Sequence, residues 1–320
     1  MCIPAAARAQ QAAPQNGLAQ AAEVYPSRPI LLMIPSSKGG GADISFRVLA
    51  AALEPVLGQK IEIVNKPADG AAEGLAALAK AKPDGYTLGG VWNGPLTASP
   101  QVRALPYTVD SFDTVASVYE SDYAVCARKD FPAETGPALV ALLREKPLGY
   151  TYSNEGRGGA GYFAGERLFE ALGVLVRSEN YDGSGEAAKN FLAGAVDLYV
   201  GTVPAIQAHI KSGSVKCLIV LSTRRPDILR QAATTREIGA EGTEAALWRM
   251  IIAPKGLPKD RRAKLEAAIR KAMAAPSVQT FLAVQGERAL ADGGPETMAR
   301  LKKEFAAFSD LTSRLGVKSE

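Results

Sequence analysis

The stretch Ile30-Leu31-Leu32-Met33-Ile34-Pro35-Ser36-Ser37-Lys38-Gly39-Gly40-Gly41-Ala42-Asp43 decides the fold, because it joins a short apolar strand to a glycine turn and a helix. Ile44, Val48, Ala52 and Val56 then recur every four residues, which predicts one apolar helical face. Glycines let the backbone turn tightly, and the first N–H groups of a helix attract anions. Lys38 adds a positive charge. The turn is therefore a candidate anion site.

Strands and helices alternate after this turn. Residues 60–64 read as a strand, residues 71–81 as a helix and residues 86–92 as the next strand. Three strand–helix units in succession predict a parallel sheet with helices on both faces. Ligands of such sheets bind beyond the carboxyl ends of the strands. We therefore expect the glycine turn and the segment Trp92-Asn93-Gly94 to face the same cleft.

A second series of elements repeats this layout. We expect separate strands at 115–119 and 124–127, and a strand at 150–154 that leads into a glycine-rich turn, 155–161, and a helix. Later elements are expected as helices over 162–172, 186–193 and 204–211, strands over 196–200, 215–221 and 248–253, and C-terminal helices over 259–274, 276–285 and 295–315. Two α/β units, each with a glycine turn before a helix, predict two lobes with a ligand site between them.

The composition is that of a globular protein. The chain has 320 residues, of which 47% are hydrophobic, and a net charge of +4. Its basic residues form neither a run nor a stripe with aromatic residues, which argues against nucleic-acid binding. No apolar stretch reaches the ~18 residues that a membrane span needs.

Residues 1–23 differ from the rest of the chain, because they are rich in Ala and Gln and lack hydrophobic periodicity. Ala7-Arg8-Ala9 and Ala19-Gln20-Ala21 resemble the small residues that precede a signal-peptidase site, although no apolar segment comes before them. We expect the remainder of a signal peptide here. A plain disordered tail is the alternative.

The cysteines fit no metal site and no CxxC redox pair. Cys126 and Cys217 lie in strand-like apolar runs, and Cys2 lies in the tail. We expect Cys126 and Cys217 to be buried free thiols. A disulfide between them is the alternative if the protein is exported.

No motif in the sequence nominates an enzyme. The glycine turn lacks the GxGxxG spacing of dinucleotide-binding proteins, and neither a P-loop nor a GxSxG elbow occurs. His209, the single histidine, is expected on a helix among apolar residues, where a structural role is commoner than catalysis. Ser153 has no evident base, and Asp43 and Asp182 suit helix capping. We expect no catalytic residue, no metal and no cofactor.

Several short motifs follow one another in the order typical of one receptor family. They are Tyr25-Pro26-Ser27-Arg28-Pro29-Ile30, then Pro35 with Gly39, Gly40, Asp43 and Arg47, then Asn65-Lys66-Pro67, Pro83-Asp84-Gly85-Tyr86-Thr87-Leu88, Leu105-Pro106-Tyr107, Tyr152-Ser153 with Gly156 and Gly158, Tyr181-Asp182-Gly183-Ser184, and Ala253-Pro254-Lys255-Gly256-Leu257-Pro258. Through these motifs the chain resembles the substrate-binding receptors of tripartite tricarboxylate transporters, the Bug-type periplasmic solute-binding proteins, over about residues 25–316.

The resemblance implies the type II periplasmic-binding-protein fold, an α/β architecture with two lobes and a ligand cleft between them. Two crossover strands near residues 119–125 and 246–251 would join the lobes. Lobe one would comprise residues 24–123 plus 248–320, and lobe two residues 124–247. The lobes would close around the ligand because it makes better contacts in the closed state.

The resemblance also implies a set of binding residues. In the family, ligand carboxylates are held by the first glycine turn and by the turn after the Tyr-Ser strand, partly through ordered water. Carried over to this sequence, the set comprises Ser36, Ser37, Gly39, Gly40 and Asp43 in lobe one, Trp92 and Asn93 in a third segment, and Ser153, Gly158, Gly159, Ala160 and Asp182 in lobe two.

The chain departs from the family pattern before its first glycine turn. Ser36, Ser37 and Lys38 replace the usual aromatic residue and proline, and Tyr162 replaces a frequent histidine. The added donors predict an anionic ligand that is held more directly than usual. A Lys38 side chain that extends into solvent is the alternative. Trp92 either stacks on a ligand ring or serves packing alone.

The function that the resemblance implies is capture of a small carboxylate-bearing organic acid in the periplasm. A monomeric receptor would deliver this ligand to membrane permease subunits and would bind no nucleic acid. Two other functions remain open on the same scaffold, a small-molecule enzyme and a ligand sensor. The sequence does not identify the carboxylate.

Overall fold

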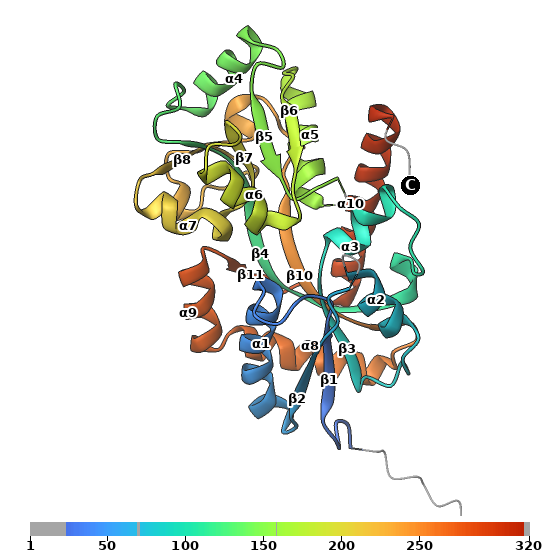
Figure 1. Ribbon diagram of the computed structural model, residues 1–320. Coiled ribbons are helices and arrows are strands. Elements are labelled where there is room, and N and C mark those ends of the chain that lie inside the picture. Colours follow the sequence, from blue (N-terminus) through green and yellow to red (C-terminus); the bar gives the residue numbers. More distant parts are fainter. Residues whose placement is uncertain (1–23, 69–70, 158, 317–320) are drawn as a thin grey trace, which may run out of the picture.

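Figure 1 shows the computed structural model, in which two α/β lobes share a pair of long central strands. The structure describes residues 24–68, 71–157 and 159–316. The tail 1–23 and Gly158 lie outside the described residues, so the predictions made for them stay predictions. In the described part of the chain, no helix is both long enough and apolar enough to cross a lipid bilayer.

The first lobe is built on a sheet with the strand order β2-β1-β3-β10-β4. Strands β1, β2 and β3 are parallel, as the strand–helix alternation predicts, whereas β10 pairs with β3 in the antiparallel direction. The elements that open the chain are β1 (Ile30–Ile34), α1 (Gly41–Leu57), β2 (Ile61–Asn65), α2 (Ala72–Ala79), β3 (Thr87–Trp92) and the short α3 (Gly94–Thr97).

The second lobe repeats this plan around β4, β5, β6, β7 and β8. Strand β5 pairs in parallel with β6 and β7, and β4 pairs with β7 and β8 in the antiparallel direction. Its elements are α4 (Gly136–Glu145), β5 (Thr151–Asn154), α5 (Ala160–Leu172), β6 (Arg177–Asn180), α6 (Gly183–Leu192), β7 (Leu198–Thr202), α7 (Val203–Lys211), β8 (Val215–Val220) and β9 (Ala233–Thr234).

Two strands, β4 (Phe112–Arg128) and β10 (Ala246–Pro254), pass from one lobe to the other and pair with each other. The expectation of separate strands at 115–119 and 124–127 is wrong, because β4 continues through Ser121 and Asp122. These polar residues resemble a turn in the sequence, but their place between two sheets lets both backbone and side chains find partners. Asp122 pairs with Arg288, and Ser121 donates a hydrogen bond to Glu287.

Helix α1 buries a different face from the one that the fourfold spacing predicts. Phe46, Leu49 and Leu53 are buried, whereas Ile44 is 46% exposed. Four residues turn a helix through about 400°, so a strict spacing of four drifts by about 40° at each step. The fourfold spacing therefore places Ile44 on the buried face, although its side chain is exposed. It places the later residues only at the edge of that face.

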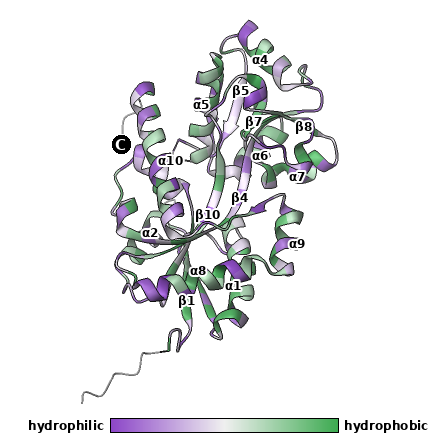
Figure 2. Cartoon of the chain, turned by 180° about the vertical axis from the view of Figure 1, so that it is seen from behind, coloured by the Kyte–Doolittle hydropathy of each residue, from purple (hydrophilic) through white to green (hydrophobic). Residues whose placement is uncertain are grey.

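The C-terminal helices cover the existing sheets, as expected, and one of them contacts both lobes. Here the elements are α8 (Lys259–Met273), α9 (Pro276–Gln285), β11 (Arg288–Ala289) and α10 (Gly294–Leu315). Leu301 of α10 packs in the core of lobe one, while Phe308 and Leu311 pack in the core of lobe two. The ring of Phe308 stacks on Phe163 of α5, with 4.9 Å between centroids. Hydrophilic residues lie on the outer face of α10 (Figure 2).

Cys126 and Cys217 form a disulfide, so the expectation of two free thiols is wrong. Strands β4 and β8 are antiparallel neighbours, and their register places the two cysteines directly opposite each other. The sequence shows two apolar runs but not whether they pair as strands, so it does not bring the two cysteines together.

Candidate functional site

The first glycine turn is fastened to α1 by a buried carboxylate. Gly39 adopts a φ of +80°, which favours glycine, and its N–H donates to Asp43 Oδ2 at 2.8 Å. Asp43 also accepts hydrogen bonds from Arg47 Nε and from Asn65 Nδ2, both at 2.9 Å, and is 1% exposed. Asp43 thus holds the shape of the turn and ties it to the end of β2.

The hydrogen bond from Arg47 is the main cause that lowers the pKa of Asp43 to about 2, and the bonds from Gly39 and Asn65 add to it. A carboxylate in an unfolded chain has a pKa near 3.9. The Asp43 interactions therefore contribute stability above about pH 4 and lose it as the pH falls toward 2.

We expect the variant Asp43→Asn to reduce the free energy of unfolding by about 1–3 kcal/mol at pH 7, because it weakens hydrogen bonds to a charged group. Urea unfolding at several pH values measures the effect, and its size should shrink between about pH 4 and 2. Asp310→Asn, which removes one partner of an exposed ion pair with Arg314, is the control and should change little. A deficit that stays constant from pH 7 to pH 2 would contradict the assignment.

The three residues before the glycines differ in exposure. The hydroxyl of Ser36 is buried and has no hydrogen-bond partner among the described residues. Ser37 and Lys38 are exposed, and the carbonyl of Ser37 accepts a hydrogen bond from the Gly40 N–H at 3.1 Å. The structure therefore gathers the residues predicted for lobe one at the start of α1.

Arg249 lies beside this helix start, although it belongs to none of the motifs that the sequence shows. It is 9% exposed and sits on β10 opposite Tyr119 of β4. Its Nη1 donates to Glu287 Oε1 at 2.6 Å, but its Nε has no partner among the described residues. A Cβ atom built on Gly41 would lie 3.8 Å from Nη2. An arginine within the apolar run of β10 was the signal that could have identified it.

Three hydroxyl groups on one face of β4 connect the two lobes. Tyr119 donates to the carbonyl of Ser45 in α1 at 3.1 Å, and Ser121 donates to Glu287 at 2.6 Å. Tyr123 donates to Glu155, in the glycine-rich turn before α5. Burial raises the pKa of Tyr123 well above its usual value, so its hydroxyl stays protonated. Alternate residues of a strand share a face, so these groups and Arg249 form one polar surface between the lobes.

In lobe two, the side chain of Glu155 lies at the start of α5. Its Oε1 accepts hydrogen bonds from Tyr123 and from the N–H of Gly161 at 2.6 Å, and its Oε2 accepts one from Ser184 at 2.9 Å. A carboxylate at a helix N-terminus is stabilised by the helix dipole. We define the interlobe site as the start of α1, Arg249, the hydroxyl row on β4 and Glu155.

The other residues predicted in lobe two take different positions. Ser153 is fully buried, and its hydroxyl donates to Leu198 O at 3.5 Å inside the lobe. Gly159 precedes α5, and Ala160 is its first residue. Asp182 precedes α6, but its side chain forms no capping hydrogen bond, so the capping prediction is wrong there. The backbone N–H of Asp182 instead donates to Glu186 at 3.0 Å.

Trp92 ends β3 and Asn93 follows it, close to lobe two. A Cβ atom on the next residue, Gly94, would lie 3.2 Å from Trp92 Nε1 and 3.8 Å from the backbone N of Ala160. Asn93 is 1% exposed and accepts a hydrogen bond from the Trp248 N–H at 3.2 Å. Its amide donates to Glu304 of α10 at 2.6 Å. Asn93 thus ties β3, β10 and α10 together.

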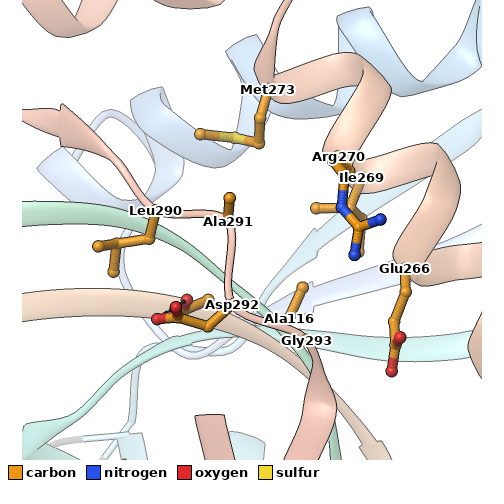
Figure 3. A pocket seen from close by; sticks show the side chains of 10 residues that line it. Ala116, Glu266, Ile269, Arg270, Met273, Leu290, Ala291, Asp292 and Gly293 are labelled. Atoms are coloured by element: carbon orange, nitrogen blue, oxygen red, sulfur yellow. Dashed lines mark hydrogen bonds between the residues drawn. The ribbon is translucent and has the colours of Figure 1, made fainter. Parts of the chain in front are cut away.

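Cavities that the described residues line also occur outside the interlobe site. Figure 3 shows a hollow of about 10 Å³ between α8 and the segment after β11, which Met273 and Leu290 help to line. It has room for about one water molecule. A cavity of about 390 Å³ lies against α10, on the face of β4 that carries Glu120 and Asp122. Arg288 pairs with both of these carboxylates and Arg300 pairs with Glu120, so each carboxylate there has a cationic partner.

Metal-ligating side chains do not cluster in the described part of the chain, where no group of three His, Cys, Asp or Glu could hold an ion. His209 lies on α7, and its Nδ1 is 3.2 Å from the hydroxyl of Ser214, within the last turn of the helix and the loop that follows. This contact is local and distant in sequence from the residues of the interlobe site.

Two lobes on shared crossover strands, with a helix start from each lobe and a buried guanidinium between them, define a solute-binding receptor of the two-lobed class. The sequence matches the tripartite tricarboxylate transporter family receptor over residues 45–311. The chain belongs to this family, as the order of its motifs predicts, and the family consists of periplasmic receptors.

Curated relatives and solved structures agree with this assignment. BugT of Bordetella pertussis is 27% identical over 300 residues, which cover 93% of this chain and 92% of that protein. A UPF0065 protein of Agrobacterium vitis is 31% identical over 291 residues, 91% of this chain and 84% of that protein. The structure of the periplasmic binding protein BugD has a TM-score of 0.76 at 30% identity, with 92% and 100% of the two chains covered. MatC of Rhodopseudomonas palustris with bound malate has a TM-score of 0.76 at 26% identity, with 89% and 99% covered.

Proposed function

We propose that this receptor captures a small carboxylate-bearing organic acid between its lobes and delivers it, chemically unchanged, to the membrane permease subunits of a tripartite tricarboxylate-type transporter. The observation that carries the proposal is the buried guanidinium of Arg249 beside the start of α1. The first N–H groups of a helix have no partner within the helix and favour anions. MatC, a relative of similar fold, holds malate.

In this proposal the predicted residues have three kinds of role. Ser36, Ser37, Lys38, Gly39 and Gly40 contact the ligand from lobe one, whereas Asp43 and Asn93 position the segments around it. Trp92, Gly159 and Ala160 bound the site where the lobes approach each other. Lobe one comprises residues 24–123 plus 248–320 and lobe two residues 124–247, with α10 packed against both. The receptor acts as a monomer in the periplasm.

Thermal unfolding in the presence of an organic-acid library tests the proposal. A ligand at 100 times its Kd should stabilise the native protein by about 2.7 kcal/mol, and calorimetry should then give a stoichiometry of one. Mass spectrometry of the recovered ligand should show no chemical change. Turnover of the ligand would support the alternative of an enzyme on this scaffold, and an unchanged melting temperature with every carboxylate would contradict capture.

A further inference from the structure

The carboxylate of Glu155 makes the lobe-two end of the interlobe site negative. Its three hydrogen-bond donors are a tyrosine hydroxyl, a serine hydroxyl and a backbone N–H, all of which are neutral. No Lys or Arg of the described residues forms an ion pair with Glu155. The charge is therefore stabilised by hydrogen bonds and the helix dipole but is not neutralised by a cation.

Glu155 also occupies the donors that a ligand carboxylate would need in lobe two. The Gly161 N–H and the Ser184 hydroxyl both donate to it, at 2.6 Å and 2.9 Å. A second carboxylate placed there would meet a like charge at close range and would find these donors in use. A ligand ammonium would instead meet an anion with free lone pairs on Oε2, which accepts one hydrogen bond from the described part of the chain.

The lobe-one end of the interlobe site has the opposite polarity. The start of α1 lies beside Arg249, whose Nε has no partner among the described residues, and both groups favour an anion. Arg249 is opposite Tyr119 on β4, and Glu155 is bound to Tyr123 on the same face. Four residues of strand separate these positions, a span of roughly 13 Å.

We propose that the ligand of this receptor carries an ammonium group as well as a carboxylate, with the ammonium bound by Glu155 and the carboxylate bound by Arg249 and the start of α1. This inference rests on the proposed function, and it deepens that function by naming the chemical class of the ligand.

Matched pairs of ligands test the inference by calorimetry on the full-length protein. L-aspartate and L-malate differ by an ammonium in place of a hydroxyl, and 6-aminohexanoate and adipate differ by an aminomethyl group, CH2–NH3+, in place of a carboxylate. A charge-assisted hydrogen bond to Glu155 should make wild-type protein bind the amino member of at least one pair about tenfold more tightly.

Two variants then test whether Glu155 causes the preference for the amino ligand. Glu155→Gln keeps the size of the side chain and removes its charge, so it should abolish the preference for the amino ligand. Glu166→Gln is the matched control, because Glu166 lies within α5 and accepts a hydrogen bond from Tyr152 at 2.5 Å. It removes the same charge from the same lobe, and the preference should remain.

The outcomes separate the inference from the proposed function. Wild-type protein that binds malate or adipate as tightly as the amino partner overturns the inference and leaves carboxylate capture intact. An equal loss of affinity for both members of a pair in Glu155→Gln assigns Glu155 to capping of α5 alone and also overturns it. Wild-type protein that binds none of the four probes or any other carboxylate overturns both proposals. The comparison of the paired ligands on wild-type protein tests the inference even if the Glu155→Gln variant fails to fold.

Discussion

Replacing Arg249 with methionine should lower the affinity for the carboxylate ligand by about 10- to 100-fold, because hydrogen bonds to a charged group contribute about 1.5–3 kcal/mol. The guanidinium is buried beside the start of α1, where its Nη2 would lie 3.8 Å from a Cβ atom on Gly41, and its Nε has no hydrogen-bond partner among the described residues. Calorimetry with the best ligand of the library measures the change.

Arg249→Met alone leaves Glu287, whose side chain is 4% exposed, without its cation, and this can destabilise the fold. The double variant Arg249→Met/Glu287→Gln removes the cost of burying an unpaired carboxylate and keeps the hydrogen bond from Ser121. It should fold and still bind weakly. Arg230→Met, which removes an exposed arginine paired with Asp227, is the control and should bind normally. Wild-type affinity in the double variant would contradict a ligand contact by Arg249.

Removing the disulfide should lower the free energy of unfolding by about 2–5 kcal/mol. Cys126 and Cys217 are separated by 91 residues, so the crosslink restricts a large part of lobe two in the unfolded chain. The double variant Cys126→Ala/Cys217→Ala should unfold at a lower urea concentration than the oxidised wild type.

Reduction supplies the control for this experiment. Dithiothreitol should shift the unfolding of wild-type protein toward that of the double variant and should leave the double variant unchanged. Ligand affinity should be similar in both proteins, since the disulfide lies in β4 and β8, away from Arg249 and Glu155. Equal unfolding curves for oxidised and reduced wild-type protein would contradict a stabilising crosslink.

The sequence predicts the parts of the fold that depend on local patterns. The parallel strands β1, β2 and β3, the helices between them and the C-terminal helices all follow from short apolar runs and turn residues. The ends of elements are predicted less well. For example, α6 begins at Gly183 and β7 at Leu198, whereas the sequence predicts starts at 186 and 196. Local patterns do not predict the full length of β4, because its polar middle is stabilised by partners from distant segments.

The residues of the interlobe site also divide into those that local sequence patterns predict and those that they do not. The glycine turn before α1 is recognised because its glycines, strand and helix are adjacent in sequence. The place of Arg249 beside Gly41 depends on the pairing of β10 with β3 and β4, which no local pattern reveals. Asp43 and Asn93 illustrate the converse, because their polar side chains look available in the sequence but are bound by Arg47, Asn65, Trp248 and Glu304 in the structure.

Helix α10 restricts how the two lobes can separate. Leu301 is anchored in one core and Phe308 in the other, so the distance between the lobes is fixed along this edge while the helix stays packed. A motion that opens the interlobe site is then a rotation about an axis close to α10. The opposite edge, where Gly286 at the end of α9 lies beside Gln207 of α7, is then the part that we expect to travel farthest.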